Sequence, residues 1–244
     1  MSNVLNEMQQ LRLLFIKWSN FDLVEAEKMY DFVVNEQPKK LGTPIVKDEP
    51  KKLGTPIVSD RPDGIYFILS SNNIIHESSA TDEDKRNSIA VGVKMGNKFA
   101  NVTLNDAAEG KSVSLFVYDK TPDKITVAVP HNDDYDVISD WNGLENTNKL
   151  RNQLNPDINL SKDEYIPSMA QLFLILLNIK NINRALDEAG GKLIEKDWYW
   201  SSTDDNDEDY MWELNFNGGG YDIESKIGRG ILRTSVICEF DNIN

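Results

Sequence analysis

The chain contains a single cysteine, Cys238, and this restricts its fold more than any other feature of the sequence. One thiol cannot close an internal disulfide, and the two histidines, His76 and His131, lie far apart, so no Cys/His set for a structural zinc site is present. The packing of apolar side chains must therefore hold the fold together. With 244 residues, 40% of them hydrophobic, the chain can form one good core and a small second unit.

The net charge of −14 limits the partners that the chain can have. Nucleic acid and anionic membrane surfaces would be repelled, so we expect neither as a partner. No segment approaches the roughly 18 to 20 apolar residues of a membrane helix, so no membrane insertion is expected. The first basic residue is Arg12 and the apolar run Leu13 to Ile16 is short, so we expect no signal peptide and synthesis in a host cytoplasm.

Residues 1–36 are predicted to form a helical arm for anchoring or oligomerisation. Apolar side chains recur at spacings of four and three residues, the rhythm of a coiled-coil seam. They are Val4, Met8, Leu11, Phe15 and Trp18. The alternative is a helical hairpin that packs on its own domain.

Residues 37–62 contain the nine-residue segment PKKLGTPIV twice, at Pro38 to Val46 and at Pro50 to Val58. Proline and glycine in each copy exclude a helix and favour an extended linker. Two interpretations remain open. The copies are either a duplicated tether or two equivalent segments that bind a repeated partner.

Residues 63–130 are predicted to be rich in β-strands, because β-branched and aromatic residues cluster between turn residues such as Gly96 and Asn97. The predicted strands are Ile65 to Leu69, Ile89 to Val93, Ser112 to Tyr118 and Lys124 to Val129.

Residues 131–244 combine helices with aromatic strands. Ser168 and Gln171 have the spacing of a capping box ahead of an apolar helix. A second helix is expected from about Asn181 to Ala189, where Gly190 and Gly191 end it. Strands are expected in the segments DWYWSST, YMWELNFN and ILRTSVICEF. The predicted fold class is α+β.

The order of several short motifs in this part of the chain is specific. These are Asp140–Gly143, Glu145–Thr147, Ile166–Ser168, Ile182–Asn183, Ala185–Leu186, Tyr199–Thr203, Trp212, Gly218–Gly220 and Leu232–Arg233. Together they resemble the C-type-lectin-like, formylglycine-generating-enzyme-like domains of gut Bacteroidales and their phages, including target proteins of diversity-generating retroelements. The upstream segments DGIYFIL and SIAVGVKMG also resemble these proteins, so the likeness covers about residues 63–240.

The resemblance implies a C-type-lectin-like domain at residues 131–244 whose irregular face between the last strands binds the ligand. Polar side chains with interspersed tyrosines suit such a face, because tyrosine gives a large contact area at a low cost in entropy. The resemblance also implies that Trp200 and Trp212 belong to the core and that Arg233 is a buried structural hydrogen-bonding residue. The predicted ligand-binding residues are Asp204, Asp205, Asn206, Asp207, Tyr210, Asn215, Asn217, Tyr221 and Asp222.

No enzymatic activity, cofactor or metal is expected. Formylglycine-generating members of the superfamily use a pair of cysteines, whereas Cys238 is alone in an apolar segment typical of a buried thiol. No G-x-S-x-G, H-E-x-x-H or Walker motif is present. The acidic run from Asp204 to Asp209 could offer oxygen ligands to calcium, but its spacing is not that of an EF-hand, and a solvated loop is the favoured interpretation.

We therefore expect a virion-associated phage fibre or decoration protein. Phage proteins reach the outside by host lysis, which suits a chain for which no signal peptide is expected. Its C-terminal face would bind a host-surface glycan or protein, and residues 1–62 would contact other virion proteins and form a homo-oligomer. The alternatives are a purely structural capsid or tail component and a bacterial binding protein diversified by a retroelement.

Overall fold

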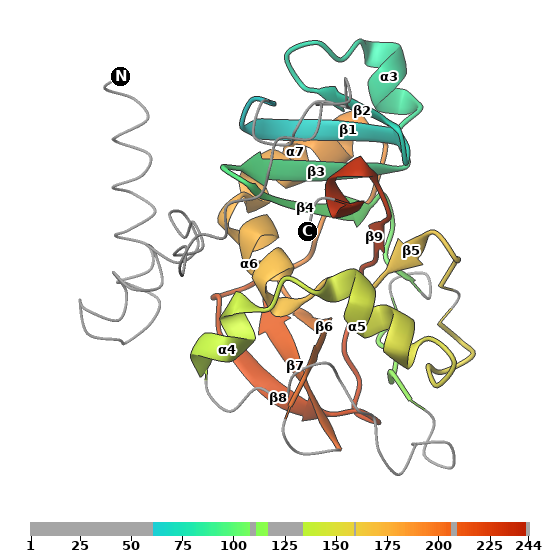
Figure 1. The fold of residues 1–244 in the computed structure, drawn as a ribbon, viewed down its shortest axis with the longest axis vertical. Coiled ribbons are helices and arrows are strands. Elements are labelled where there is room, and N and C mark those ends of the chain that lie inside the picture. The colour runs from blue at the N-terminus through green and yellow to red at the C-terminus, as the bar shows by residue number, and fades with distance from the viewer. Residues whose placement is uncertain (1–60, 108–110, 117–133, 159, 206–208, 243–244) are drawn as a thin grey trace, which may run out of the picture. The chain divides into compact units, whose positions relative to one another are not determined.

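The computed structural model describes residues 61–107, 111–116, 134–158, 160–205 and 209–242. Asp63–Asn242 fall within one compact unit that combines antiparallel sheets with short helices (Figure 1), which confirms the α+β class. The predicted arm at 1–36, including Val4, Met8, Leu11, Phe15 and Trp18, lies outside the described residues, as does nearly all of the linker. The predicted division between 63–130 and 131–244 stays a prediction.

A four-stranded antiparallel sheet with the order β2-β1-β3-β4 forms the first half of the unit. Its strands are β1 (Gly64–Ser70), β2 (Asn73–His76), β3 (Ala90–Met95) and β4 (Lys98–Thr103). The predicted strands Ile65 to Leu69 and Ile89 to Val93 are thus confirmed to within one or two residues. Four consecutive residues of β1 are buried, so both faces of the sheet are covered at this strand.

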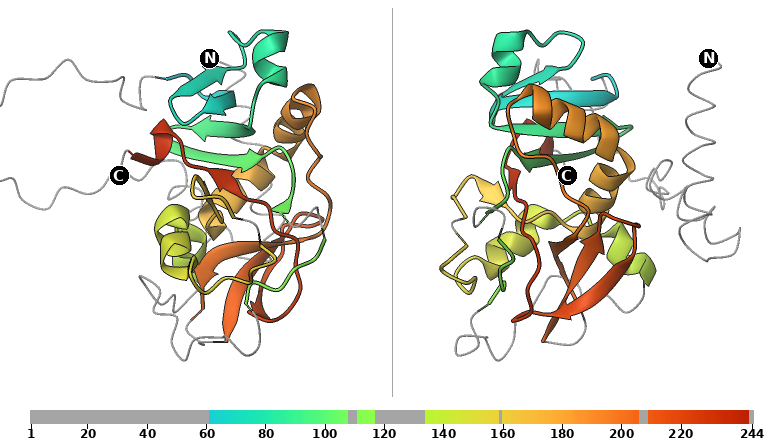
Figure 2. Two further views of the ribbon diagram at one scale, coloured as in Figure 1. Left: turned by 90° about the vertical axis from the view of Figure 1, so that its right-hand side faces the viewer. Right: turned by 180° about the vertical axis from the view of Figure 1, so that it is seen from behind.

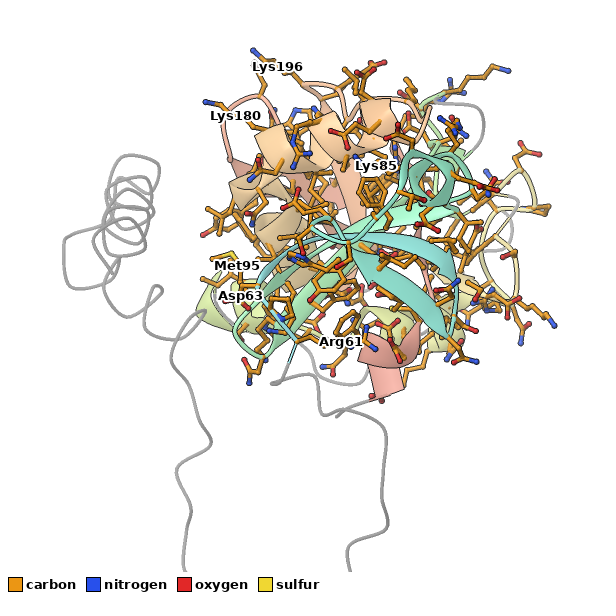
Figure 3. The ribbon with its side chains drawn as sticks, turned by 90° about the horizontal axis from the view of Figure 1, so that it is seen from above. Arg61, Asp63, Lys85, Met95, Lys180 and Lys196 are labelled. Atoms are coloured by element: carbon orange, nitrogen blue, oxygen red, sulfur yellow. The ribbon has the colours of Figure 1, made fainter. Side chains whose placement is uncertain are left out.

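The turn between β3 and β4 is fixed by Asp63, the residue before β1. Its carboxylate accepts hydrogen bonds from the Gly96 amide at 2.9 Å and from the Lys94 ammonium at 2.8 Å. Gly96 adopts a φ of 59°, a left-handed conformation that glycine takes without strain. Figure 3, which views this sheet from its β2 edge, shows Asp63 next to Met95.

Three helices pack against the four-stranded sheet: α3 (Asp82–Arg86), α6 (Met169–Leu177) and α7 (Ile179–Glu188). Figure 2 shows α6 and α7 along one side of the sheet. The predicted capping box of α6 is confirmed, because the Ser168 amide donates to the Gln171 side chain at 2.9 Å. The predicted end of α7 is confirmed as well, since Gly190 follows it with a φ of 74°.

Two further helices, α4 (Asp134–Ser139) and α5 (Gly143–Leu150), precede the short strand β5 (Glu164–Tyr165). β5 pairs with β9 (Ser235–Val236), and the 3-10 helix η4 (Glu239–Asn242) follows. None of the helices in the described ranges is long and apolar enough to cross a membrane.

The predicted strand at Ser112 to Tyr118 is wrong in its described part. Residues 112–116 form only one isolated bridge, between Val113 and Gly230. Leu115 and Phe116 are adjacent and both are buried, so this segment does not alternate between two faces as a half-buried strand does. The predicted strand Lys124 to Val129 lies outside the described residues.

The predicted strand over Ile231 to Phe240 is also wrong, because only the two residues of β9 are paired as a strand. Hydrogen bonds from side chains to the backbone connect this segment to β4. Asn101 of β4 donates to the Val236 carbonyl at 3.1 Å and accepts from the Val236 amide at 2.8 Å, and the Ser235 hydroxyl donates to the Asn101 carbonyl at 2.6 Å.

Arg233 connects this last segment to the first sheet. Its buried guanidinium donates to the carbonyls of Thr103 at 2.9 Å, Leu104 at 2.9 Å and Lys192 at 2.7 Å. It also donates to the Asp106 carboxylate at 2.8 Å, and both side chains of this ion pair are almost fully buried. Arg233 is therefore the structural hydrogen-bonding residue that the resemblance implied.

Arg233→Met should lower the free energy of unfolding by about 3 kcal/mol or more, because it leaves the buried Asp106 carboxylate without the guanidinium and three carbonyls without their donor. Urea unfolding followed by tryptophan fluorescence measures this loss. Arg184→Met is the control, since Arg184 is 45% exposed in its ion pairs with Glu77 and Glu188, and it should cost less than about 1 kcal/mol. Equal losses in the two variants would contradict the assignment.

Candidate functional site

The segment predicted to form an irregular ligand-binding face is largely a β-hairpin. A three-stranded antiparallel sheet has the order β6-β7-β8, with β6 (Trp198–Asp204), β7 (Tyr210–Asn215) and β8 (Tyr221–Ser225). The strands β6 and β7 were predicted, whereas β8 was not. A signal for β8 is present in the sequence YDIES, in which Tyr221 and Ile223 alternate with Asp222 and Glu224.

Asp204 does not belong to an exposed face, so the prediction that it binds a ligand there is wrong. Its side chain is 2% exposed and its carboxylate lies 2.8 Å from the ammonium of Lys226, which is equally buried. Burial raises the pKa of Asp204 to about 6, although the hydrogen bond and charge of Lys226 oppose this shift. The pair fastens the end of β6 to the chain just after β8.

The other predicted polar residues are spread over two turns. Asp205 is half-buried, while Asn206 and Asp207 lie outside the described residues. The turn between β7 and β8 contains Asn215 and Asn217, and the Asn215 side chain accepts from the Asn217 amide at 2.7 Å. Asn215 thus shapes the turn while Asn217 is exposed.

One side of the β7–β8 hairpin forms an aromatic face, which consists of Tyr210, Trp212, Tyr221 and Ile223. The register pairs Trp212 with Ile223 and places Tyr221 beside Leu214, so these side chains share one side of the sheet. The ring of Tyr221 lies 5.8 Å from that of Trp212 and 5.7 Å from that of Phe173 in α6. Ile223 is 38% exposed, and the three aromatic side chains are half-buried.

The two tryptophans predicted to be core residues have different positions. Trp200 is fully buried, and its indole donates to the Val113 carbonyl at 2.9 Å, so that prediction is confirmed. Trp212 is only half-buried, and the prediction is wrong for it. The reason is strand alternation, because Trp212 points to the side of β7 opposite to Met211, which joins the core cluster with Trp200.

The other side of the hairpin forms an acidic face, which consists of Glu213, Asp222 and Glu224. Glu213 and Asp222 are direct cross-strand partners, and Asp222 is exposed. The Asp222 carboxylate accepts from the Ile223 amide and the Glu224 carboxylate from the Ser225 amide, each at 2.8 Å. Two of the backbone donors at this edge of the sheet are thus already occupied by carboxylates of the same strand.

The motifs that carry the family resemblance meet in a buried polar network around Asp140. One oxygen of its carboxylate accepts from the Asn142 amide at 2.8 Å. The other accepts from the Asn146 side chain at 2.8 Å and from the Thr203 hydroxyl at 2.7 Å. The Met169 amide in turn donates to Thr203 at 2.9 Å. The network joins the starts of α5 and α6 to β6.

The side chains with reactive groups have structural surroundings. Cys238 is buried, and burial raises the pKa of its thiol far above its ordinary value, which disfavours the reactive thiolate. Within the described ranges, no group of three or more His, Cys, Asp or Glu residues is arranged to hold a metal ion.

The sequence matches no protein-family model, and neither a curated protein nor a solved structure is similar to it.

Lys226→Met should raise the pKa of Asp204 above its value of about 6, because the variant removes the cation that favours the ionised carboxylate. A ¹³C NMR titration of the aspartate carboxyl groups measures this pKa. Lys149→Met is the control, since Lys149 pairs with Glu145 on the exposed side of α5 and should leave Asp204 unchanged. A titration midpoint that did not move in Lys226→Met would refute the role of this ion pair.

Proposed function

We propose that the chain is a non-enzymatic recognition protein of a phage virion, a fibre or decoration subunit that binds a glycan or protein on the host surface. The aromatic face is the observation that carries this proposal. Tyr210, Trp212, Tyr221 and Ile223 offer partly exposed apolar and aromatic surface on paired strands. The family resemblance points to the same part of the chain as the ligand-binding region.

The construction of the aromatic face favours binding. Aromatic side chains that are held in place before binding lose little entropy when a ligand contacts them. Phe173 supports Tyr221 from the apolar helix α6, and β7 lies between two other strands. A rigid support of this kind lets the exposed edges of the rings stack on a sugar or on an apolar side chain of a protein.

We propose further that residues 131–244 form a C-type-lectin-like domain. The support is that Asp140, Asn146, Ser168 and Thr203, which all lie in the motifs of the resemblance, take part in buried hydrogen bonds. If the motif residues define a common scaffold, they should have structural roles of this kind. Residues 1–62 would then anchor the domain to other virion proteins as a homo-oligomer, which multiplies weak contacts.

Replacement of both Tyr210 and Tyr221 by alanine should weaken binding of the full chain to intact gut Bacteroidales cells by about tenfold or more, because two aromatic contacts are lost. Binding of the fluorescently labelled chain in flow cytometry measures this. Leu193→Ala is the matched control, since Leu193 is 46% exposed on a different part of the unit. Binding that is as strong in the double variant as in the control would exclude the aromatic face.

Deletion of residues 1–62 separates recognition from a purely structural role. The remaining unit, Asp63–Asn242, contains the whole hairpin and its supporting helices. We expect this unit to compete with the full chain for the same cells, with an affinity reduced by the loss of avidity. A truncated chain that is folded by circular dichroism but does not compete even at high concentration would favour the structural role.

A further inference from the structure

Glu213 carries a buried carboxyl group that forms no ion pair with any described residue. Its side chain lies on the acidic face of the central strand β7, and the residue is only 7% exposed. Its Oε2 atom has no hydrogen-bond partner, and no ion pair to Glu213 is found in the part of the chain that the structure describes. A buried ionised carboxylate in such surroundings is costly, and a carboxyl group responds by keeping its proton.

The Glu213 carboxyl group lies close to Gly230, where the absence of a side chain provides space for it. A Cβ atom at Gly230 would lie 3.2 Å from Glu213 Oε2 and 3.1 Å from the Trp200 indole nitrogen. Gly230 is held in place by reciprocal backbone hydrogen bonds with Val113, at 2.9 and 3.2 Å. Glu213 therefore sits between the sheet and the segment that follows β8.

The charged groups around Glu213 are predominantly acidic. Asp222 and Glu224 face it from β8, and Asp197 is the residue before β6. All three charges, together with the larger effect of burial, raise the pKa of Glu213 to about 7. On the segment after β8, the Lys226 ammonium lies 2.8 Å from Asp204, and Arg229 is exposed.

We propose that Glu213 is a proton-binding site that couples the order of the β7–β8 hairpin to pH near neutrality. With the proton bound, the carboxyl is neutral and the hairpin packs on Trp200 and Gly230. Loss of the proton places a negative charge in this buried site beside Asp222 and Glu224, and the two strands loosen. The site acts on the hairpin whatever the aromatic face binds.

The direction of the effect follows from linkage. When the strands open, Glu213 reaches solvent and titrates near its ordinary pKa of 4.5, compared with about 7 when they are closed. Between these two values the closed hairpin holds a proton that the open one has released, so a rise in pH favours opening. With these pKa values, the closed-to-open ratio should fall about tenfold between pH 6 and pH 8.

Hydrogen–deuterium exchange of the full chain, corrected for the intrinsic pH dependence of exchange, tests this proposal. Protection of residues 210–225 should fall about tenfold from pH 6 to pH 8, whereas β1 and β3 should keep theirs. Glu213→Gln, a neutral isostere, should abolish the fall. Asp187→Asn is the control, because Asp187 is exposed on α7 and should behave as the unaltered chain.

A second variant tests the electrostatic part. Glu224→Gln removes the neighbouring charge with the largest effect on the pKa of Glu213.

A neighbouring negative charge raises the pKa of Glu213, so Glu224→Gln lowers that pKa. The fall in protection should therefore begin at a lower pH in Glu224→Gln than in the unaltered chain. A fall of equal size in Glu213→Gln, no fall in the unaltered chain, or an unchanged midpoint in Glu224→Gln would each overturn the proposal.

Discussion

The guanidinium of Arg233 is the constraint on which the rest of the unit depends. It donates to the carbonyls of Thr103 at the end of β4, of Leu104 and of Lys192, and it pairs with the buried Asp106 carboxylate. These groups belong to segments far apart in the sequence. Once they are tied together, the residues beside Arg233 have fixed places: Leu232 enters the core cluster with Trp200, and the Thr234 carbonyl accepts from the Thr103 amide at 2.8 Å. The two main sheets are thereby held in one unit.

Buried ion pairs and polar networks connect distant segments of this unit, as disulfides do in other small domains. The pairs Asp106–Arg233 and Asp204–Lys226 are both almost inaccessible to solvent. Such pairs contribute little net stability, because desolvation offsets most of their attraction. A mispaired arrangement, however, would bury a charge without its partner, and the desolvation penalty of that charge would not be compensated. They therefore disfavour alternative registers more than they add net stability. The Asp204–Lys226 pair does this for the hairpin, since it joins the two ends of the three-stranded sheet.

The sequence predicts those elements whose signals are local. The capping box at Ser168 and the glycine after α7 are examples, because the residues that decide each of them lie within one turn of helix. The errors arise where distant contacts decide. In the sequence, Asp204 belongs to an acidic run typical of a solvated loop, but in the structure it pairs with the distant Lys226. The segment around Leu115 has the composition of a strand, but the structure buries both Leu115 and Phe116. The strand β8 was missed because its acidic residues obscured an alternating pattern.

The construction of β8 limits the ways in which another chain could pair with the hairpin. As the last strand of its sheet, β8 would ordinarily offer free backbone donors to an added strand. The carboxylates of Asp222 and Glu224 already accept from the Ile223 and Ser225 amides, so strand addition would have to displace both. The same alternation that places these carboxylates on one side places Tyr221 and Ile223 on the other. Contact through the side chains of the aromatic face is therefore favoured over pairing along the edge.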